Sequence, residues 1–545
     1  MRWSDLDISY ARPLCWITAL LGKHVVPFTV GNLHSGRSSE GHRQLCRQTF
    51  NIATAQDYVQ RLKEHQVMVD VKERQQSISE QLDTLEKSLQ GHIVARDEVL
   101  EEVVDLVEWP TVTHANFAES FLKVPKEVLI SEMVEHQKYF PIANDDGSLK
   151  NTFVITADTT PNEAIRQGNV KVLSARLADG AFLYEQDLKV PLQTFNEKLK
   201  EVTFQKELGS VFDKVKRLQA HVKALHQYFP DSDLAKVQRA ALLCKADLAS
   251  DMVYEFPDLQ GVMGSHYALA HGEDNDVAQA IDEHWMPRGE NAPLPKSLTG
   301  TILSLAEKFD NIISCFGTNR KPTSSSDPYA LRRQMLGIIK MLITGQHHLP
   351  FQKTLRQCFE HFPPTIKEHQ EQVLTDIEAF TVNRIKTVFQ DYDLSKDEVE
   401  ASISGGFSDI YDAFRKVKAL HDFRQQSQEQ FTSLLEVYKR AKGQTEGYAN
   451  QSFSPKLLEE KAEKALANVL NSIHQDFEAA INNHNYDHAY SLIAKMQQPL
   501  ATLFDEVHIL AKDPTLRNNR IALLQQVFAL FDKLVDFEKI QQKTL

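Results

Sequence analysis

Helical periodicity dominates the chain from about residue 195 to its C-terminus. In AALLCKADLASDMVYEFPDL, small and apolar side chains recur at helical spacing at Ala241, Leu242, Leu248 and Met252. The segments beyond Tyr329 continue this pattern without a clear strand. The chain is therefore predicted to be mainly α-helical, and its 545 residues are too many for one core.

Residues 1–190 differ, because strand-like and helical segments alternate there. Apolar runs near the N-terminus are separated by Gly22 and Gly31, which are typical of turns. Further on, the amphipathic segment VLISEMVEHQKYF is followed by the turn signal Asp145-Asp146-Gly147 and the apolar run TFVITAD. An α+β region is predicted over residues 1–190.

Charge and cysteine usage limit the class of protein. The net charge of -13 argues against a general polyanion binder, although a local basic face can still dominate binding. No run of about 18 apolar residues is present, so no membrane-spanning segment is expected. The five cysteines are widely spaced without a CxxC pair, which favours reduced thiols in a cytoplasmic protein: Cys15, Cys46, Cys244, Cys315 and Cys358.

Acidic residues and histidines are distributed over several predicted helices between residues 240 and 333. Asp247, His266, His284 and Asp310 could converge on a metal and a phosphate, as in HD-type phosphohydrolases. However, the His-Asp dipeptide is missing, because Lys245 and Ala246 precede Asp247. A metal-dependent hydrolase needs such ligands to activate water, so this function remains only an alternative and no metal site is predicted.

Other catalytic motifs are also missing. The sequence contains no GxxxxGK[ST] loop, no GxGxxG after a strand, no HExxH zinc pattern and no GxSxG nucleophile elbow. No catalytic residue is therefore predicted on this chain.

Two basic clusters lie in the C-terminal third. One comprises Lys439, Arg440 and Lys442, and the other comprises Arg517 and Arg520 with Asn519 between them. Arg and Lys neutralise phosphates and Asn can hydrogen-bond base edges, so these clusters suit RNA. The alternative is that each is an ordinary solvated helix face.

Eight ordered blocks resemble the beta subunit of the bacterial-type, two-subunit glycyl-tRNA synthetase, over nearly the whole chain. The blocks are MRWSDLDISYARPLCWITALLG, SGRSSEGHR, EEVVDLVEWP, FLKVPKEVLISEMVEHQKYFPI, VLSARLADGAFLYEQD, CKADLASDMVYEFPDLQGVMG, PTSSSDPYALRRQ and LFDEVHILAKDPTLRNNRIALL.

The resemblance implies a division of labour between two subunits. In this family the alpha subunit makes glycyl-adenylate from glycine and ATP with Mg²⁺, and the beta subunit grips tRNA-Gly. The expected partners are therefore the alpha subunit, in an alpha2beta2 assembly, and tRNA-Gly. No cofactor is expected on this chain.

The resemblance also implies domains and RNA contacts. It implies a B3/B4-like α+β region over 1–190, a degenerate HD-type helical domain over 191–345, a helical linker region over 346–407 and a DALR-like anticodon-binding domain over 408–545. The two C-terminal clusters would then lie near the anticodon stem-loop.

Two departures from the family pattern lead to further expectations. Beta subunits normally open with a stretch ahead of the MRW block, so the N-terminal domain is expected to be incomplete, and an inactive truncated scaffold is an alternative. The HD pattern is degenerate, so Asp247 and Asp310 are expected to be remnants or polar groups within helix packing. Lys245 and Arg332 are expected to contact RNA at the acceptor arm.

Overall fold

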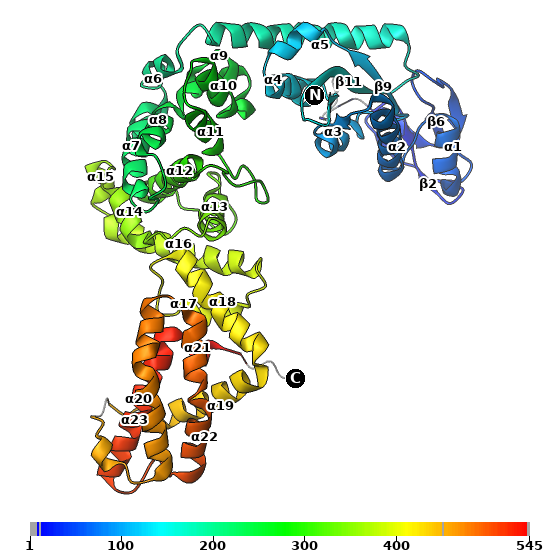
Figure 1. The fold of residues 1–545 in the computed structure, drawn as a ribbon. Coiled ribbons are helices and arrows are strands. Elements are labelled where there is room, and N and C mark those ends of the chain that lie inside the picture. Colours follow the sequence, from blue (N-terminus) through cyan, green and yellow to red (C-terminus); the bar gives the residue numbers. More distant parts are fainter. Residues whose placement is uncertain (1–7, 10–11, 13, 450–451, 542–545) are drawn as a thin grey trace. The chain divides into compact units, whose positions relative to one another are not determined.

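The computed structural model describes residues 8–9, 12, 14–449 and 452–541 (Figure 1). Helices make up 60% of it and strands 9%, which confirms the prediction of a mainly helical protein with small sheets. None of the described helices is both long and apolar enough to cross a membrane.

The chain forms two compact units. Unit 1 comprises Met1–Pro191 and Leu248–His266, and unit 2 comprises Leu192–Asp247 and Tyr267–Leu545. The segment 248–266 therefore leaves the helical domain that the sequence predicted over 191–345 and packs with the α+β region instead.

Short strands form the first part of unit 1. In the described residues before 52 they make a three-stranded sheet in the order β1-β5-β4 and two hairpins, β2-β3 and β6-β7. Their bounds are β1 (Ile17–Thr18), β2 (Leu20–Leu21), β3 (His24–Val25), β4 (Thr29–Val30), β5 (Leu33–Gly36), β6 (Ser38–Glu40) and β7 (Thr49–Asn51).

A four-stranded antiparallel sheet forms the second part of unit 1, in the order β8-β10-β11-β9. Its strands are β8 (His92–Ile93), β9 (Thr111–Asn116), β10 (Phe140–Ala143) and β11 (Leu149–Ala157). Gly147 has a φ of 78°, which glycine adopts without steric cost, and lies in the turn between β10 and β11. This turn confirms the predicted hairpin.

Helices pack against this sheet. They are α2 (Val71–Leu89), α3 (Arg96–Val103), α4 (Lys126–Ser131) and α5 (Glu163–Asp187), whereas Leu62 of α1 (Tyr58–Glu64) joins Phe50 and Ile52 in a small core of the first part of unit 1. The π-helix η3 (Glu132–His136) continues α4 directly. Buried apolar residues of α2, α3, β10 and β11 form one core, so α2 and α3 pack against the sheet as a layer of helices.

The returning segment 248–266 contributes α9 (Asp251–Glu255), the 3-10 turn η6 (Pro257–Leu259) and the first part of α10 (Val262–Ala270). Asp187, at the end of α5, accepts hydrogen bonds from the backbone N–H groups of Asp251 (3.1 Å) and Met252 (3.0 Å). A carboxylate in this position satisfies amides that the first turn of α9 leaves unpaired.

Helix α12 (Leu298–Gly317) forms the centre of the first half of unit 2. Its sequence is apolar on nearly all sides, which predicts a helix surrounded by protein, and almost every residue in it is buried. It contacts α7 (Val211–His226), α8 (Leu234–Leu243), α11 (Asn275–Glu283) and α13 (Leu331–Thr344).

The predicted linker region over 346–407 is part of the same packed body. It forms α14 (Phe351–Phe359), α15 (Pro364–Lys367), α16 (Gln370–Gln390) and α17 (Lys396–Ile403). Helix α16 packs on α12 and α13, and Phe351, Ile377 and Phe389 are fully buried. The segment is helical, as predicted, and neighbouring helices cover its apolar face.

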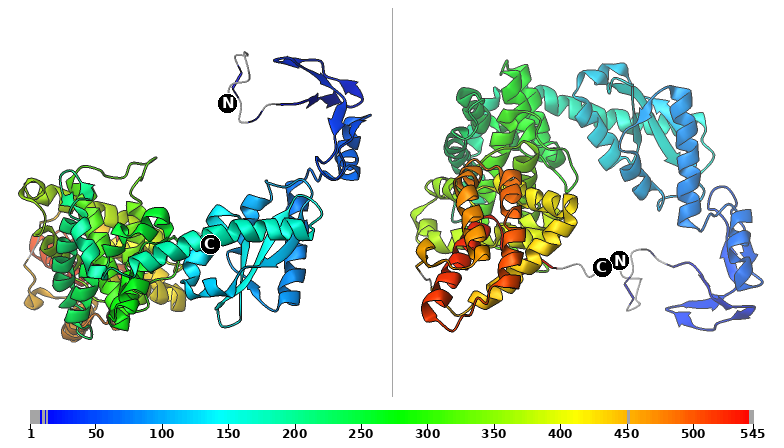
Figure 2. Two further views of the ribbon diagram at one scale, coloured as in Figure 1. Left: turned by 90° about the horizontal axis from the view of Figure 1, so that it is seen from above. Right: turned by 60° about the horizontal axis from the view of Figure 1, so that its bottom comes forward.

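The C-terminal helices share one apolar core. Figures 1 and 2 show these helices packed together as a bundle. They are α18 (Ile410–Gln426), α19 (Gln428–Thr445), α20 (Lys461–Asn482), α21 (Tyr486–Ala494), α22 (Gln497–Glu506) and α23 (Pro514–Leu534). Helices α20 and α23 lie side by side.

Candidate functional site

Lys245 follows α8 and lies in the buried centre of unit 2. Its side chain is 2% exposed, and its Nζ lies 2.9 Å from His284 Nε2 and 3.1 Å from Glu307 Oε1. The same Nζ lies 3.5 Å from the centroid of the Trp285 ring. An ammonium group held by these partners cannot reach an RNA ligand, so the predicted RNA contact of Lys245 is wrong.

His284 is oriented to accept a hydrogen bond from Lys245. Its Nδ1 lies 2.5 Å from the carbonyl oxygen of Ile281, which places the ring proton on Nδ1 and leaves the Nε2 lone pair for Lys245. Burial, and secondly the charge of Lys245, hold the pKa of His284 well below its ordinary value. The ring is therefore neutral, and its Nε2 lone pair is already used.

Asp310, on α12, is surrounded by cationic side chains. Its carboxylate lies 2.7 Å from Arg217 Nε, 3.1 Å from Lys214 Nζ and 3.3 Å from His221 Nε2. Burial alone raises the pKa of Asp310, but Lys214 and Arg217 outweigh it and hold the pKa well below the ordinary value. Asp310 is thus a polar group tied into helix packing.

The four residues suggested as an HD-type site do not act as one donor set. His266 belongs to unit 1, where its Nε2 lies 3.0 Å from Glu127 Oε2, whereas Asp247, His284 and Asp310 belong to unit 2. The charges of Lys245 and its neighbours neutralise the carboxylates that a divalent ion would need. These residues do not fit a catalytic metal.

A second group of possible metal ligands lies in unit 1. One ligand atom each of His42, Glu108 and Asp158 lie within 4.8 Å of one another. His42 Nδ1 accepts the backbone N–H groups of Gln44 and Leu45, both at 3.1 Å, so the ring proton is on Nε2. That Nε2 lies 3.1 Å from Asp158 Oδ1. A protonated nitrogen is not a metal ligand, so this group is a polar contact within unit 1.

The first predicted C-terminal cluster lies near the end of α19 and is partly accessible. The side chain of Arg440 is 58% exposed and lies 3.8 Å from Asp505, and that of Lys442 is 34% exposed and lies 3.7 Å from Asp532. Lys439 is half-buried, because its Nζ donates to the carbonyl oxygen of Ile540 at 2.9 Å. Arg440 and Lys442 are the members of this cluster that solvent reaches best.

The second predicted cluster, on α23, faces mostly inward. Asn519 is 2% exposed, and its side chain exchanges two hydrogen bonds with the backbone of Ser454, at 2.7 and 3.1 Å. Arg520 is 8% exposed, forms an ion pair with Glu463 and donates to the carbonyl oxygen of His508. The predicted RNA contacts of Asn519 and Arg520 are therefore wrong, whereas Arg517 is only half-buried.

Arg332 lies at the start of α13. Its backbone N–H donates to Asp327 at 3.0 Å, and its guanidinium donates to the carbonyl oxygen of Thr323. The side chain is half-buried against its own loop, so an RNA contact there remains a prediction.

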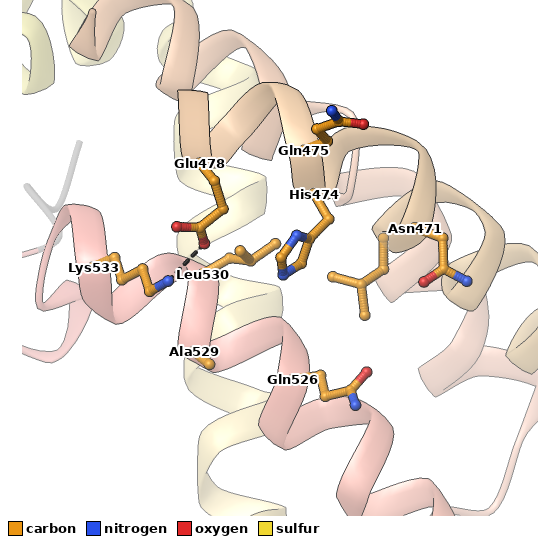
Figure 3. A pocket seen from close by; sticks show the side chains of 9 residues that line it. Asn471, His474, Gln475, Glu478, Gln526, Ala529, Leu530 and Lys533 are labelled. Atoms are coloured by element: carbon orange, nitrogen blue, oxygen red, sulfur yellow. Dashed lines mark hydrogen bonds and ion pairs between the residues drawn. The ribbon is translucent and has the colours of Figure 1, made fainter. Parts of the chain in front are cut away.

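A groove between α20 and α23 has a cavity volume of about 570 Å³ (Figure 3). This groove was not predicted from the sequence, although uncharged polar residues at i, i+3 and i+4 on α20 give a recognisable signal. Its lining residues are Leu470, Asn471, His474, Gln475, Glu478, Gln526, Ala529, Leu530 and Lys533.

Comparison with known proteins identifies both parts of the chain. Residues 1–404 match the family model "Glycyl-tRNA synthetase beta subunit", and residues 427–541 match "DALR anticodon binding domain". The second match covers the helices that carry the two basic clusters and the groove.

Curated relatives agree over the whole chain. The glycine–tRNA ligase beta subunit of Desulforamulus reducens is 39% identical over 551 residues, covering 100% of this chain and 79% of that protein. The corresponding subunits of Geobacter metallireducens and Geotalea daltonii are 37% and 36% identical over 542 residues, covering 99% of this chain and 79% and 78% of those proteins. The resemblance drawn from eight sequence blocks is confirmed: the chain belongs to the glycyl-tRNA synthetase beta subunit family.

Proposed function

We propose that this chain is the tRNA-binding beta subunit of a glycine–tRNA ligase. The observation that carries the proposal is the match over the full chain to beta subunits, together with the DALR domain at 427–541. The chain would bind tRNA-Gly and position its 3′ end for glycine transfer. Positioning of this kind contributes to a rate without a catalytic side chain.

The partner in this proposal is the alpha subunit. It would bind glycine and ATP with Mg²⁺ and form glycyl-adenylate, in an alpha2beta2 assembly in the cytoplasm. The missing phosphate-binding loops in this sequence are consistent with ATP chemistry on another chain.

Phosphate contacts on α19 would set the register of the bound tRNA. Arg440 and Lys442 lie near the end of this helix, and their charges are only loosely paired, at 3.8 and 3.7 Å. Exposed ion pairs of this length contribute little stability, so RNA phosphates can replace Asp505 and Asp532 at small cost.

The alternative, a metal-dependent phosphohydrolase, conflicts with the buried charges of unit 2. Hydrolysis needs carboxylate and imidazole ligands to hold an ion, but Lys245 occupies the lone pair of His284, and Lys214 and Arg217 pair with Asp310. The tRNA-binding proposal needs no such site.

Reconstitution tests the proposal. The full chain is mixed with separately produced alpha subunit, glycine, ATP, Mg²⁺ and tRNA-Gly, and glycyl-tRNA is measured. We expect product only when both subunits are present. Charging by the alpha subunit alone at the same rate, or no charging by the mixture, would contradict the proposal and in the second case favour an inactive scaffold.

A charge variant tests the part played by α19. Arg440→Ala/Lys442→Ala should weaken tRNA-Gly binding and lower the slope of log K against log salt by about one to two units, because each phosphate contact releases a counterion. Lys418→Ala removes a lysine of α18 that is 56% exposed, close to the 58% of Arg440, and serves as the control. An unchanged slope in the double variant would exclude these side chains as phosphate contacts.

A further inference from the structure

The groove between α20 and α23 is built from one face of each helix. Its residues on α20 and on α23 follow i, i+3, i+4 and i+7 spacing, so each set lies along one side of its helix. The buried side chains of Leu470 and Leu530 form the floor. Ala529, with a single methyl group, leaves the space between the helices open.

Uncharged polar side chains line the groove. Figure 3 shows His474 projecting from α20 into the space between the helices, with Gln526 of α23 near it. Asn471 lies on the same face of α20, and all three side chains are exposed. None of the three has a side-chain hydrogen-bond partner among the described residues, so their donors and acceptors remain available to a ligand.

The charged side chains that line this groove neutralise each other, so they do not favour a phosphate inside it. The charged lining residues, Glu478 and Lys533, pair with each other at 2.6 Å (Figure 3). Amides remain, and the amide of Asn or Gln presents a donor and an acceptor side by side, which matches the edge of a nucleobase. An imidazole adds a flat surface on which a base can stack.

One cation lies beyond one end of the groove, and the lining residue Lys533, paired with Glu478, lies at the other end. The first, Lys464, is exposed and precedes Asn471 by two helical turns, about 10 Å along the axis. A nucleotide whose base enters the groove would place its flanking phosphates toward these lysines.

We infer that the groove binds one unpaired nucleobase of the tRNA anticodon loop. The amides of Asn471 and Gln526 hydrogen-bond the base edge, and His474 packs against its face. The cavity of about 570 Å³ is large enough for a base with its sugar. This inference rests on the proposed tRNA-binding function and moves the base contact from the buried Asn519 to the exposed Gln526, two turns further along α23.

Binding of tRNA-Gly to the full chain tests the inference. The variant His474→Ala/Gln526→Ala should bind about tenfold more weakly, the loss expected for a base contact, while the slope of log K against log salt stays unchanged. It should also discriminate less between tRNA-Gly and transcripts with substituted anticodon-loop nucleotides. Gln498→Ala, an exposed glutamine of α22 outside the groove, should match the wild type.

A second variant blocks the groove without removing a polar group. Ala529→Phe lies at an exposed helix position, so it should fold normally and weaken tRNA binding to a similar extent. Wild-type affinity and discrimination in both variants would overturn the inference and leave the proposed function intact. A changed salt slope would also overturn it, by indicating a phosphate contact. Failure of the unmodified chain to bind tRNA-Gly would overturn both.

Discussion

A single substitution of residue type changes what the buried centre of unit 2 can do. Where an HD-type site has its His-Asp pair, this chain has Ala246 and Asp247, and the preceding Lys245 places its ammonium among His284, Glu307 and the ring of Trp285. A positively charged side chain of the protein takes the place that a metal would need. Burial lowers the pKa of Lys245 and Glu307 acts in the opposite direction, so this ammonium serves as a partner for a buried carboxylate.

Removing this charge should destabilise the protein. Lys245→Met keeps much of the side-chain volume but removes one of the two cations at Glu307, which keeps Lys214 at 3.2 Å and a hydrogen bond from Asn311 Nδ2 at 3.2 Å. We expect the free energy of unfolding to fall by about 3 kcal/mol, because a buried carboxylate loses a partner. Urea unfolding followed by circular dichroism measures the change.

Lys216→Met provides the control for this prediction. Lys216 is 59% exposed, pairs with Asp213 and lies 5.0 Å from the centroid of the Phe212 ring, so its loss should cost less than about 0.5 kcal/mol. Equal losses in the two variants would show that the Lys245 contacts do not stabilise the fold.

Sequence spacing predicted which residues share a helix face, but it did not predict which way that face points. Arg517 and Arg520 do lie one turn apart on α23, as their spacing requires. Arg520 nevertheless pairs with Glu463, and Asn519 with Ser454, which are 57 and 65 residues away. Basic side chains are typical of solvated helix faces. Arg520 is an exception, and it can be recognised only from its contact with Glu463, which is distant in the sequence.

At the scale of elements, the junction of α4 and η3 holds an unusual carboxyl group. Glu132 begins the π-helix, is 1% exposed, and its Oε2 has no hydrogen-bond partner among the described residues. Gly180 lets α5 approach closely, since a Cβ there would lie 3.2 Å from Val128. Burial raises the pKa of Glu132 to about 7, although Arg176 acts in the opposite direction.

Stability should therefore depend on pH at this junction. The folded state keeps Glu132 protonated up to a pKa of about 7, whereas the unfolded chain releases the proton near its ordinary value. The stabilising contribution is complete at low pH and is lost as the pH rises through 7. Glu132→Gln stays neutral, so at pH 8 it should be more stable than the wild type by about 2 kcal/mol.

Urea unfolding at pH 5 and pH 8 measures this effect. The advantage of Glu132→Gln should shrink to about 1 kcal/mol or less at pH 5. Glu135→Gln, an exposed neighbour in the same element, should change stability by less than about 0.5 kcal/mol at either pH. A variant that gains nothing at pH 8 would contradict the buried, neutral carboxyl group.

The sequence predicted the elements of this region only in part. The turn at Asp145–Gly147 and strand β11 follow from local signals, a glycine with positive φ and an apolar run. The π-helix does not, because VLISEMVEHQ has the pattern of an ordinary amphipathic helix. The extra residue in that turn depends on packing against α5.

For the whole molecule, the internal charge pairs predict that stability does not need a metal. The carboxylate of Asp310 is already neutralised by Lys214 and Arg217. Treatment of the full chain with a chelator should leave its melting temperature unchanged, and added Mn²⁺ or Mg²⁺ should not raise it, because a ligand stabilises only the state that binds it. Differential scanning calorimetry makes the comparison.

A rise of several degrees with Mn²⁺ would contradict this prediction. The variants Asp310→Asn and Asp158→Asn would then locate the ion, in unit 2 or unit 1. Loss of the rise in Asp310→Asn alone would revive the phosphohydrolase alternative.

The sequence-based prediction assumed that each domain is one continuous stretch of the chain. Residues 248–266 do not follow this assumption, because they belong to unit 1. Local patterns report helices and turns, but they do not report which core a helix joins. Here the capping of α9 by Asp187, more than 60 residues earlier in the chain, helps to assign the segment to unit 1. Family membership, in contrast, followed from the order of eight blocks.

The return of this segment to unit 1 affects how the protein can be dissected. The backbone passes from one unit to the other after Pro191, after Asp247 and after His266. Each unit consists of two separate segments of the chain. After a single protease cut at one of these places, one segment of a unit therefore remains covalently linked to the other unit. A gene fragment ending at residue 191 encodes unit 1 without the piece that Asp187 caps, so truncation mapping should retain 248–266, for example by a short fusion after residue 191.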